Sequence, residues 1–304
     1  MTLLMQDVPP SVGGQKQVPP RRSVGARSRR LWRTSPLTYL TLVAAVLLSA
    51  GPLYYMVVMA SRPNSDISSP TPPFTVGDQL GVNTQRVLDN EDIVFVKALV
   101  NSLLVASTAT VSVVVLCSLA GFAFAKLQFR GRSALLLVVI GTMMVPVQLG
   151  LIPLYMLMSE LQLTGSLAAV TLPFLVTGFG VFMMRQYAAA AVPDELIEAA
   201  RIDGASTLRI FFSVVLPALR PAAAVLGLFT FMERWNDFLW PYLVLNDPQN
   251  PTVQVALSRL SGGYYDDRAL VMAGTLLATL PLAAVFVIFG RQIIGGIMEG
   301  GVKA

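Results

Sequence analysis

The sequence predicts an all-α membrane protein with six transmembrane helices. Two properties of its composition support this class: 54% of the residues are hydrophobic and only 13% are charged, whereas a soluble domain carries about 25% charged residues. The third observation is six apolar runs, each close to the ~20 residues that an α-helix needs to cross a bilayer. Because backbone groups in lipid must bond within their own segment, these runs are predicted to be helices.

A polar N-terminal tail precedes the predicted spans. Residues 1–36 are rich in Pro, Gly, Ser and Arg and lack apolar periodicity, so we expect a basic, disordered tail. A cleaved signal peptide is the competing interpretation, but the apolar run that follows is too long for one. Residues 37–304 are predicted to form one transmembrane domain with a core at about 95–290. Its spans are expected at about 37–60, 99–124, 134–156, 166–184, 222–245 and 270–289.

The loops between the spans predict the orientation of the chain. Besides those of the tail, the basic residues on one side of the membrane are Lys126, Arg130, Arg132, Arg185, Arg201, Arg209, Arg220, Arg291 and Lys303. The loops on the other side contain fewer basic residues, and acidic residues offset them. The positive-inside rule therefore places both termini and the 185–220 loop in the cytoplasm.

Composition also argues against several classes of function. The sequence has no His and a single Cys, Cys117, so it lacks the commonest metal ligand and cannot form a disulfide within the chain. No H-E-x-x-H or G-x-S-x-G pattern supports a membrane-embedded enzyme. No phosphate-binding loop of the type G-x-x-x-x-G-K-[ST] is present, so ATP and Mg²⁺ are not expected to bind to this chain. The basic residues fall in loops rather than in one patch, and nucleic acid is not an expected partner.

The loop between the fourth and fifth predicted spans is expected to fold as two short helices joined by a glycine turn. Pro193 suits the first turn of a helix, and Asp194-Glu195 lies where the helix dipole favours negative charge. Gly204 can adopt the left-handed conformation that ends this helix. Ser206, or the Thr next to it, can cap the second helix, which we expect to end at Pro217.

Two alanines and a carboxylate distinguish the first of these helices. Ala199 and Ala200 carry little side chain, so a partner surface can approach them closely. Glu198 offers a carboxylate at the tip of the loop. Followed by Gly204 and Val214-x-Leu216-Pro217, this spacing resembles the EAA loop of ABC importer permeases, E-A-A-x3-G-x9-I-x-L-P, with Val214 in place of the usual Ile.

In that family the first helix of the loop docks into a cleft of the ATP-hydrolysing subunit and transmits its motion. The resemblance therefore implies an ATPase-coupling role for seven residues of this loop: Glu198, Ala199, Ala200, Asp203, Gly204, Leu216 and Pro217. The alternative interpretation is an ordinary amphipathic loop between two spans.

The fifth predicted span is the exception among spans that otherwise lack ionisable residues. Four of its side chains share one face at helical spacing: Glu233, Asn236, Asp237 and Trp240. Intramembrane charges mark a pathway or a site by default, and carboxylates, amides and an aromatic ring together suit a sugar. We therefore predict that these four residues line a substrate pathway, with Glu233 about halfway through the span. The alternative is a structural ion pair with Arg234.

Three further features allow two interpretations each. Pro146, Gly150 and Pro153 interrupt the third span, either because a broken helix lines a cavity or as a simple kink. Asn101-Ser102 at the start of the second span is as consistent with a helix-packing hydrogen bond as with a functional contact. Tyr264-Tyr265, in a predicted external loop, suits membrane anchoring or contact with a partner.

Several blocks resemble one branch of the ABC importer family. Besides the EAA loop they are Asn101-Ser102-Leu103, Met144 to Tyr155, Trp235 to Pro241, and Phe289 to Lys303. Together they are similar to the carbohydrate-uptake branch, whose maltose-permease-like inner-membrane subunit has six spans, and the resemblance covers residues 37–304. The chain end, with Tyr264-Tyr265 and Ala273-Gly274-Thr275, is similar to cellobiose- and chitobiose-type permeases. The family assigns no role to the basic tail.

The resemblance implies a function and a set of partners. Such a subunit moves a di- or oligosaccharide across the bacterial plasma membrane by alternating access and catalyses no chemistry itself. It works with a second, related permease, two ATP-binding subunits that carry ATP and Mg²⁺, and an extracytoplasmic sugar-binding protein. Two alternatives stay open: an ABC permease for another class of small solute, and an ion-coupled secondary transporter, which would be expected to carry ionisable residues in several spans.

Overall fold

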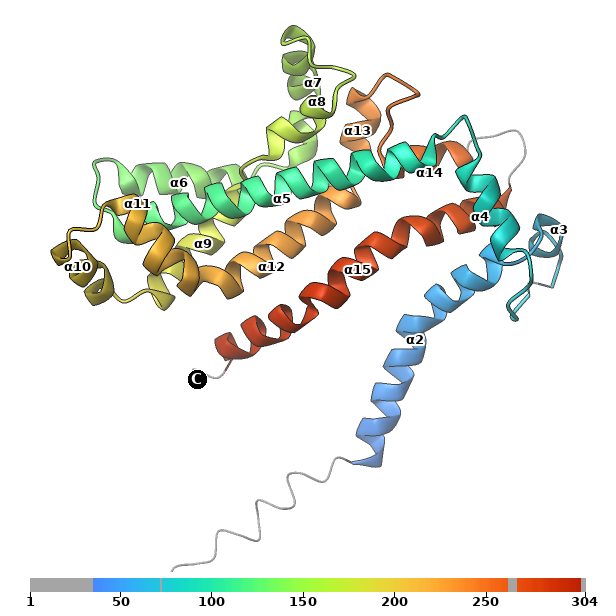
Figure 1. Ribbon diagram of the computed structural model, residues 1–304, viewed down its shortest axis with the longest axis horizontal. Coiled ribbons are helices and arrows are strands. Elements are labelled where there is room, and N and C mark those ends of the chain that lie inside the picture. The colour runs from blue at the N-terminus through green and yellow to red at the C-terminus, as the bar shows by residue number, and fades with distance from the viewer. Residues whose placement is uncertain (1–34, 72, 262–266, 302–304) are drawn as a thin grey trace, which may run out of the picture. The chain divides into compact units, whose positions relative to one another are not determined.

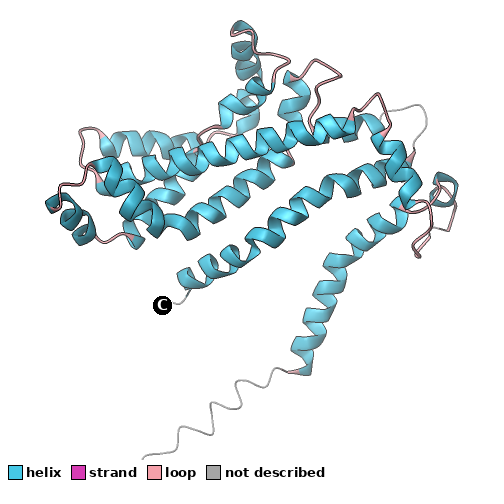
Figure 2. Cartoon of the chain, viewed as in Figure 1, coloured by secondary structure: helices cyan, strands magenta, loops and turns pink. Residues whose placement is uncertain are grey.

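The computed structural model describes residues 35–71, 73–261 and 267–301, without the side chains of residues 291–301. Contacts divide the chain into two units, Met1–Pro52 and Leu53–Ala304. All regular structure in the described residues is helical (Figure 2). The tail predicted for residues 1–36 lies outside the described residues up to residue 34, and Tyr264-Tyr265 also lies outside them.

Helix α2 (Pro36–Ala60) begins in the first unit and continues into the second. None of its 25 residues is ionisable apart from tyrosines, and its mean hydropathy is 2.0. The helix therefore confirms the first predicted span to within one residue. Pro52 lies inside it, as membrane helices tolerate.

The second unit contains the remaining helices (Figure 1). In chain order they are α3 (Asn64–Ile67), α4 (Leu80–Leu88), α5 (Phe95–Lys126), α6 (Arg132–Met143), a 3-10 turn (Val147–Gly150), α7 (Leu151–Glu160), α8 (Leu167–Thr171), a second 3-10 turn (Leu172–Phe174), α9 (Gly178–Ala191), α10 (Asp194–Ile202), α11 (Thr207–Ile210), a π-helical turn (Phe211–Val215), α12 (Leu216–Trp235), α13 (Leu239–Val244), α14 (Val253–Leu260) and α15 (Arg268–Gly301).

Four helices of the described chain are long and apolar enough to cross a bilayer: α2, α5, a continuous helix from Thr207 to Trp235, and Arg268–Gly290 of α15. Two further candidates are bent pairs. Helices α6 and α7 meet at 94°, and α8 and α9, with the turn between them, meet at 41°. Counting each bent pair as one span gives the six predicted spans. The larger bend begins at Pro146, within the interruption that the prolines predict.

The fifth predicted span, 222–245, is wrong at both ends, because the helix runs from Thr207 to Trp235. Pro217 does not end the second loop helix; it is the second residue of α12 and follows the π-helical turn. A proline is normally excluded because its ring clashes with the carbonyl of residue i−4, and the wider π turn relieves that clash. Asn236 caps the end of the helix: its backbone N–H and its side-chain amide both donate to the Met232 carbonyl, at 3.1 and 2.8 Å.

The fourth predicted span, 166–184, is also corrected. It breaks before α9 and continues to Ala191. The break occurs where the Thr177 hydroxyl accepts the Gly180 N–H at 3.0 Å and caps α9. The sequence run that suggested one straight span is therefore two helices joined by a capped corner.

Helix α5 is the centre of the second unit and packs against both α9 and α12. The α5–α9 crossing is close, because a Cβ at Gly121 would lie 2.7 Å from the Arg185 backbone nitrogen. A Cβ at Gly180 would lie 2.7 Å from Cys117 Sγ. Small residues allow this approach, which is how membrane helices gain packing energy when lipid is as apolar as their side chains.

Buried polar groups form hydrogen bonds between segments and supply the directionality that apolar packing lacks. Asn101 in α5 donates to the Asn250 side chain at 3.0 Å and to the Pro251 carbonyl at 2.9 Å. The neighbouring Ser102 hydroxyl accepts the Val253 N–H at 2.8 Å. These bonds hold the segment before α14 against α5, so the helix-packing interpretation of Asn101-Ser102 is confirmed.

The close α5–α9 crossing predicts a difference between two glycines. Gly121→Val should destabilise the purified protein by about 1–3 kcal/mol, because overpacking forces two backbones apart. Gly141→Val is the matched control: Gly141 lies in α6, and a Cβ added there would have no neighbour within 4 Å. Thermal unfolding in detergent measures both variants. Equal melting temperatures would show that the crossing is not as close as described.

Candidate coupling loop and membrane cavity

The predicted coupling loop forms two short helices at one end of the bundle. In Figure 1, α10 and α11 lie at one end of α5 and α14 lies at the other. Helix α10 begins after Pro193, with Asp194 and Glu195 in its first turn. Both acidic residues thus occupy the positive end of the helix dipole, as the sequence predicts.

A glycine turn ends α10 as the sequence predicts. Gly204 has φ +77°, a left-handed conformation that favours glycine. The Ala205 N–H donates to the Ala200 carbonyl at 2.9 Å and the Gly204 N–H donates to the Arg201 carbonyl at 3.0 Å. This pair of bonds is a Schellman motif, and Ala200 and Ala205, on either side of the turn, each pack against the core. Ala200 therefore has a structural task within its own chain.

Five of the remaining six predicted coupling residues are exposed. Glu198, Ala199 and Asp203 are exposed, as are Gly204 and Pro217. Four large apolar side chains of the same loop are also exposed: Leu196 (52%), Ile202 (87%), Leu208 (64%) and Phe212 (57%). Sequence reasoning missed these four, although their alternation with charged residues on amphipathic α10 could have identified the first two.

Helix α10 is attached to the bundle at two points. Ile197 is buried in the core that α5, α9 and α12 share. The Lys126 ammonium at the end of α5 lies 2.7 Å from an Asp194 carboxylate oxygen. The Lys126 side chain is only 8% exposed, whereas that of Asp194 is 74% exposed. This ion pair borders a hollow of about 630 Å³ that Arg132, Glu198 and other polar residues line.

The second helix continues directly into the membrane span. The Ser206 hydroxyl accepts the Arg209 N–H at 3.4 Å and caps α11, as predicted. From there the π-helical turn and α12 form one continuous helix, with Leu216 half-buried near its start. The second helix of the loop and the fifth span are therefore one continuous helix, which the Gly204 turn joins to α10.

A cavity of about 390 Å³ opens beside the other end of α12. Its walls come from the bend after α6, the corner before α9 and the last turns of α12. The lining is apolar and aromatic, with three threonines and one charged pair: Thr142, Thr177, Thr230, Glu233 and Arg234. The broken third span thus borders a cavity, as one of its two interpretations predicts.

The charged residues form a network around Arg234. Its guanidinium bonds to the Glu233 carboxylate and, at 3.2 Å, to Asp237. The same guanidinium lies 4.1 Å from the centre of the Phe174 ring, a cation–π contact. The ion pair considered as the alternative role is therefore present, while Glu233 keeps a side chain that is 63% exposed.

The four predicted pathway residues do not share one helix face, and this expectation is wrong. Helix α12 ends at Trp235, so Glu233 lies near its end rather than halfway along it, and Asn236 is the exposed cap. Trp240 belongs to the separate helix α13, where it is 2% exposed and donates its indole N–H to the Ala169 carbonyl at 3.0 Å. Of the four, only Glu233 lines the cavity.

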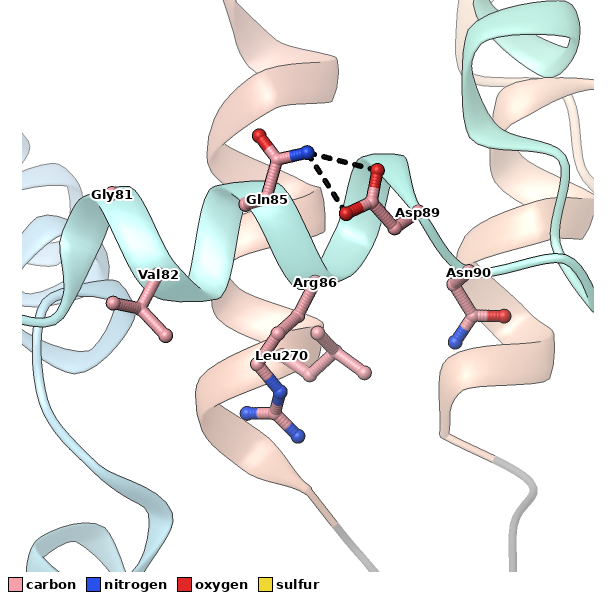
Figure 3. A pocket seen from close by; sticks show the side chains of 7 residues that line it. All are labelled: Gly81, Val82, Gln85, Arg86, Asp89, Asn90 and Leu270. Carbon is pink, nitrogen blue, oxygen red and sulfur yellow. Dashed lines mark hydrogen bonds between the residues drawn. The ribbon is translucent and has the colours of Figure 1, made fainter.

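A second hollow lies at the opposite end of the bundle from α10, between α4 and α15 (Figure 3). Gln85 and Asp89 face each other on α4, with Gln85 donating to both carboxylate oxygens. Arg86 projects from the same helix beside Leu270 of α15 and forms a 2.6 Å ion pair with Asp267. The Arg86–Asp267 ion pair ties α4 to the residue before the last span.

Known proteins resemble this chain over most of its length. The arabinooligosaccharides transport system permease protein AraQ of Halalkalibacterium halodurans is 36% identical over 203 residues, 67% of this chain and 72% of AraQ. The lactose transport system permease protein LacG of Rhizobium radiobacter is 34% identical over 265 residues, which cover 87% of this chain and 95% of LacG.

A solved structure confirms the fold. It is a bacterial ABC transporter involved in the import of the acidic polysaccharide alginate, with a TM-score of 0.73 and 22% sequence identity over 88% of this chain and 98% of that one. Residues 97–297 match a family described as the inner membrane component of binding-protein-dependent transport systems. With its six candidate spans and its two-helix loop, the chain belongs to this family of inner-membrane transport components.

Proposed function

We propose that this chain is the permease subunit of an ATP-driven importer that moves a di- or oligosaccharide inward by alternating access. The observation that carries the proposal is α10. This helix is anchored in the core by Ile197 and presents Glu198, Ala199 and exposed apolar side chains at one end of the bundle. Exposed apolar groups beside charges mark a protein-binding surface. The ATP-hydrolysing subunit is the partner that the EAA loop implies.

The carbohydrate class rests on the relatives. Those named for arabinooligosaccharides and for lactose share about a third of their residues with this chain, at 36% and 34% identity. Membership of the family removes an ion-coupled transporter from the alternatives, and an importer of another small solute is the remaining one. The fold alone does not select the charge of the solute, since the alginate transporter of the same fold is described with an acidic polysaccharide.

The proposal includes partners and an orientation. The family depends on a binding protein, and we assign that partner to the extracytoplasmic face. Two ATP-binding subunits carry ATP and Mg²⁺, and a second permease completes the pathway. The positive-inside rule places both termini and α10 in the cytoplasm. The hollow between α4 and α15 then faces outward.

Motion would pass from the ATPase to the span through two routes within the chain. One is the Asp194–Lys126 ion pair, which joins α10 to the end of α5. The other is the turn at Gly204, which leads through α11 into the continuous helix that ends beside the cavity. Docking at the loop and rearrangement at the cavity would thus involve the same helix.

The turn at Gly204 predicts a specific loss of transport. Gly204→Val forces a β-branched residue into a left-handed conformation at about 1–2 kcal/mol, so we expect sugar uptake to fall roughly tenfold or more. Gly131→Val is the matched control, because Gly131 has φ +83° in the loop before α6 and equally open surroundings. Uptake by the whole complex and co-purification of the ATPase measure the effect. Equal losses in both variants would remove the special role of the Gly204 turn.

The Asp194–Lys126 ion pair predicts a coupling defect that charge reversal repairs. Asp194→Lys places two cations together, one of them nearly buried, and we expect less sugar moved per ATP hydrolysed. The double variant Asp194→Lys with Lys126→Asp should recover part of the lost ratio of sugar moved to ATP hydrolysed. Glu195→Lys, which changes the neighbouring exposed carboxylate, is the control. A double variant no better than the single one would show that the pair does not transmit motion.

The orientation predicts which positions a membrane-impermeant thiol reagent can reach. A cysteine at Ser68 should react in intact cells, and one at Thr207 only after permeabilisation; both positions are exposed. The native Cys117 is buried and serves as the background. Reactivity in the opposite order would reverse the topology and the direction of transport.

A further inference from the structure

We infer that the cavity beside α12 selects neutral saccharides over anionic ones, and that the Glu233 carboxylate is the residue that sets this preference. The inference rests on the proposed function and adds to it that this cavity forms part of the solute pathway. Its basis is the balance of charge and hydrogen-bonding groups on the cavity wall.

The positive charge at the cavity is already occupied. Among the described residues that line it, Arg234 is the basic one. Its side chain is only 10% exposed. One guanidinium nitrogen bonds to Glu233, another to Asp237, and the face of the group lies on the Phe174 ring. A carboxylate or phosphate on a solute would have to displace these partners to bind Arg234.

The accessible charge is negative. Glu233 and Asp237 together with Arg234 carry two negative charges and one positive, so the cluster has a net charge of −1. Glu233 is 63% exposed and lines the cavity, whereas Asp237 is 18% exposed. A second anion brought into a partly desolvated cavity is repelled more strongly than in water, because the effective dielectric constant is lower.

Two of the three threonine hydroxyls of the wall match the same preference. Thr142 donates its hydroxyl hydrogen to the Val139 carbonyl at 2.7 Å, and Thr230 donates to the Leu226 carbonyl at 2.9 Å. Their oxygen lone pairs remain as acceptors, as do those of the Glu233 carboxylate. Sugar hydroxyls can donate to such acceptors, but a solute carboxylate or phosphate dianion cannot. The wall therefore favours a polyhydroxylated, uncharged ligand.

The charge of the cavity can be measured without knowing the sugar. In the complex with its partner subunits, a cysteine at Phe229, a half-exposed residue of the cavity wall, would be modified by a cationic and by an anionic methanethiosulfonate reagent. We expect the ratio of the cationic to the anionic reaction rate to be higher at this cysteine than at a cysteine placed at the exposed Ser68. Glu233→Gln should lower this preference about tenfold, the order expected for one unit charge at close range. Glu160→Gln, an exposed carboxylate at the end of α7, should leave it unchanged.

Protection of the same cysteine separates this inference from the proposed function. Two matched pairs of disaccharides would be added during labelling. The first pair is galactobiose and digalacturonate, and the second is cellobiose and the uronate of cellobiose. Slower labelling with a neutral sugar but not with its uronate supports the inference, and Glu233→Gln should let the uronate protect. No cationic preference, or equal protection by both members of a pair, overturns the charge selectivity while leaving the pathway intact. A cationic preference with no protection by any carried sugar shows that the cavity is not the pathway; the inference then fails, while the proposed permease function, which rests on the α10 loop and on the relatives, is tested separately by uptake.

Discussion

The close approach of α5 and α9 is the contact on which the rest of the second unit depends. Neither Gly121 nor Gly180 leaves room for a Cβ: Gly121 meets the α9 backbone at Met184 and Arg185, and Gly180 meets the Cys117 side chain of α5. Membrane helices gain no hydrophobic energy by leaving lipid, and such close packing supplies the attraction instead. Helix α12 then packs against both α5 and α9. The loop at one end of α12 and the cavity at the other are therefore positioned by one crossing.

The loop was predictable because its signals are local. Two acidic residues, a glycine and a serine cap each act within a few residues, and each has the role in the structure that its chemistry predicts; Pro193 lies just before the first turn rather than in it. The structure adds a reason for the second alanine of the loop. Ala200 supplies the carbonyl that closes the Schellman turn and packs against the core, so a larger side chain would disturb the packing beside the turn.

The fifth span and the pathway residues were less predictable because non-local contacts decide them. Helical spacing alone groups Trp240 with Glu233, but the helix ends between them at the Asn236 cap, and Trp240 lies in a separate helix. The Trp240 ring then packs edge-on against Phe174, which also contacts Arg234. Phe174 is far from Arg234 along the chain, and no periodicity in the fifth span indicates that it lies there. Composition identified where charge occurs in the membrane, while the partners of that charge required the fold.

The π-helical turn at Phe211–Val215 sets the angle between the docking loop and the span that follows. A π turn behaves as a single inserted residue within an α-helix. Each residue of an α-helix rotates the chain by about 100°. Loss of one residue from this turn would therefore swing α10 around the axis of α12 by roughly that angle while leaving both helices intact. The direction in which the docking surface faces therefore depends on the number of residues in this five-residue turn. Insertions or deletions in the turn would change that direction more than substitutions would.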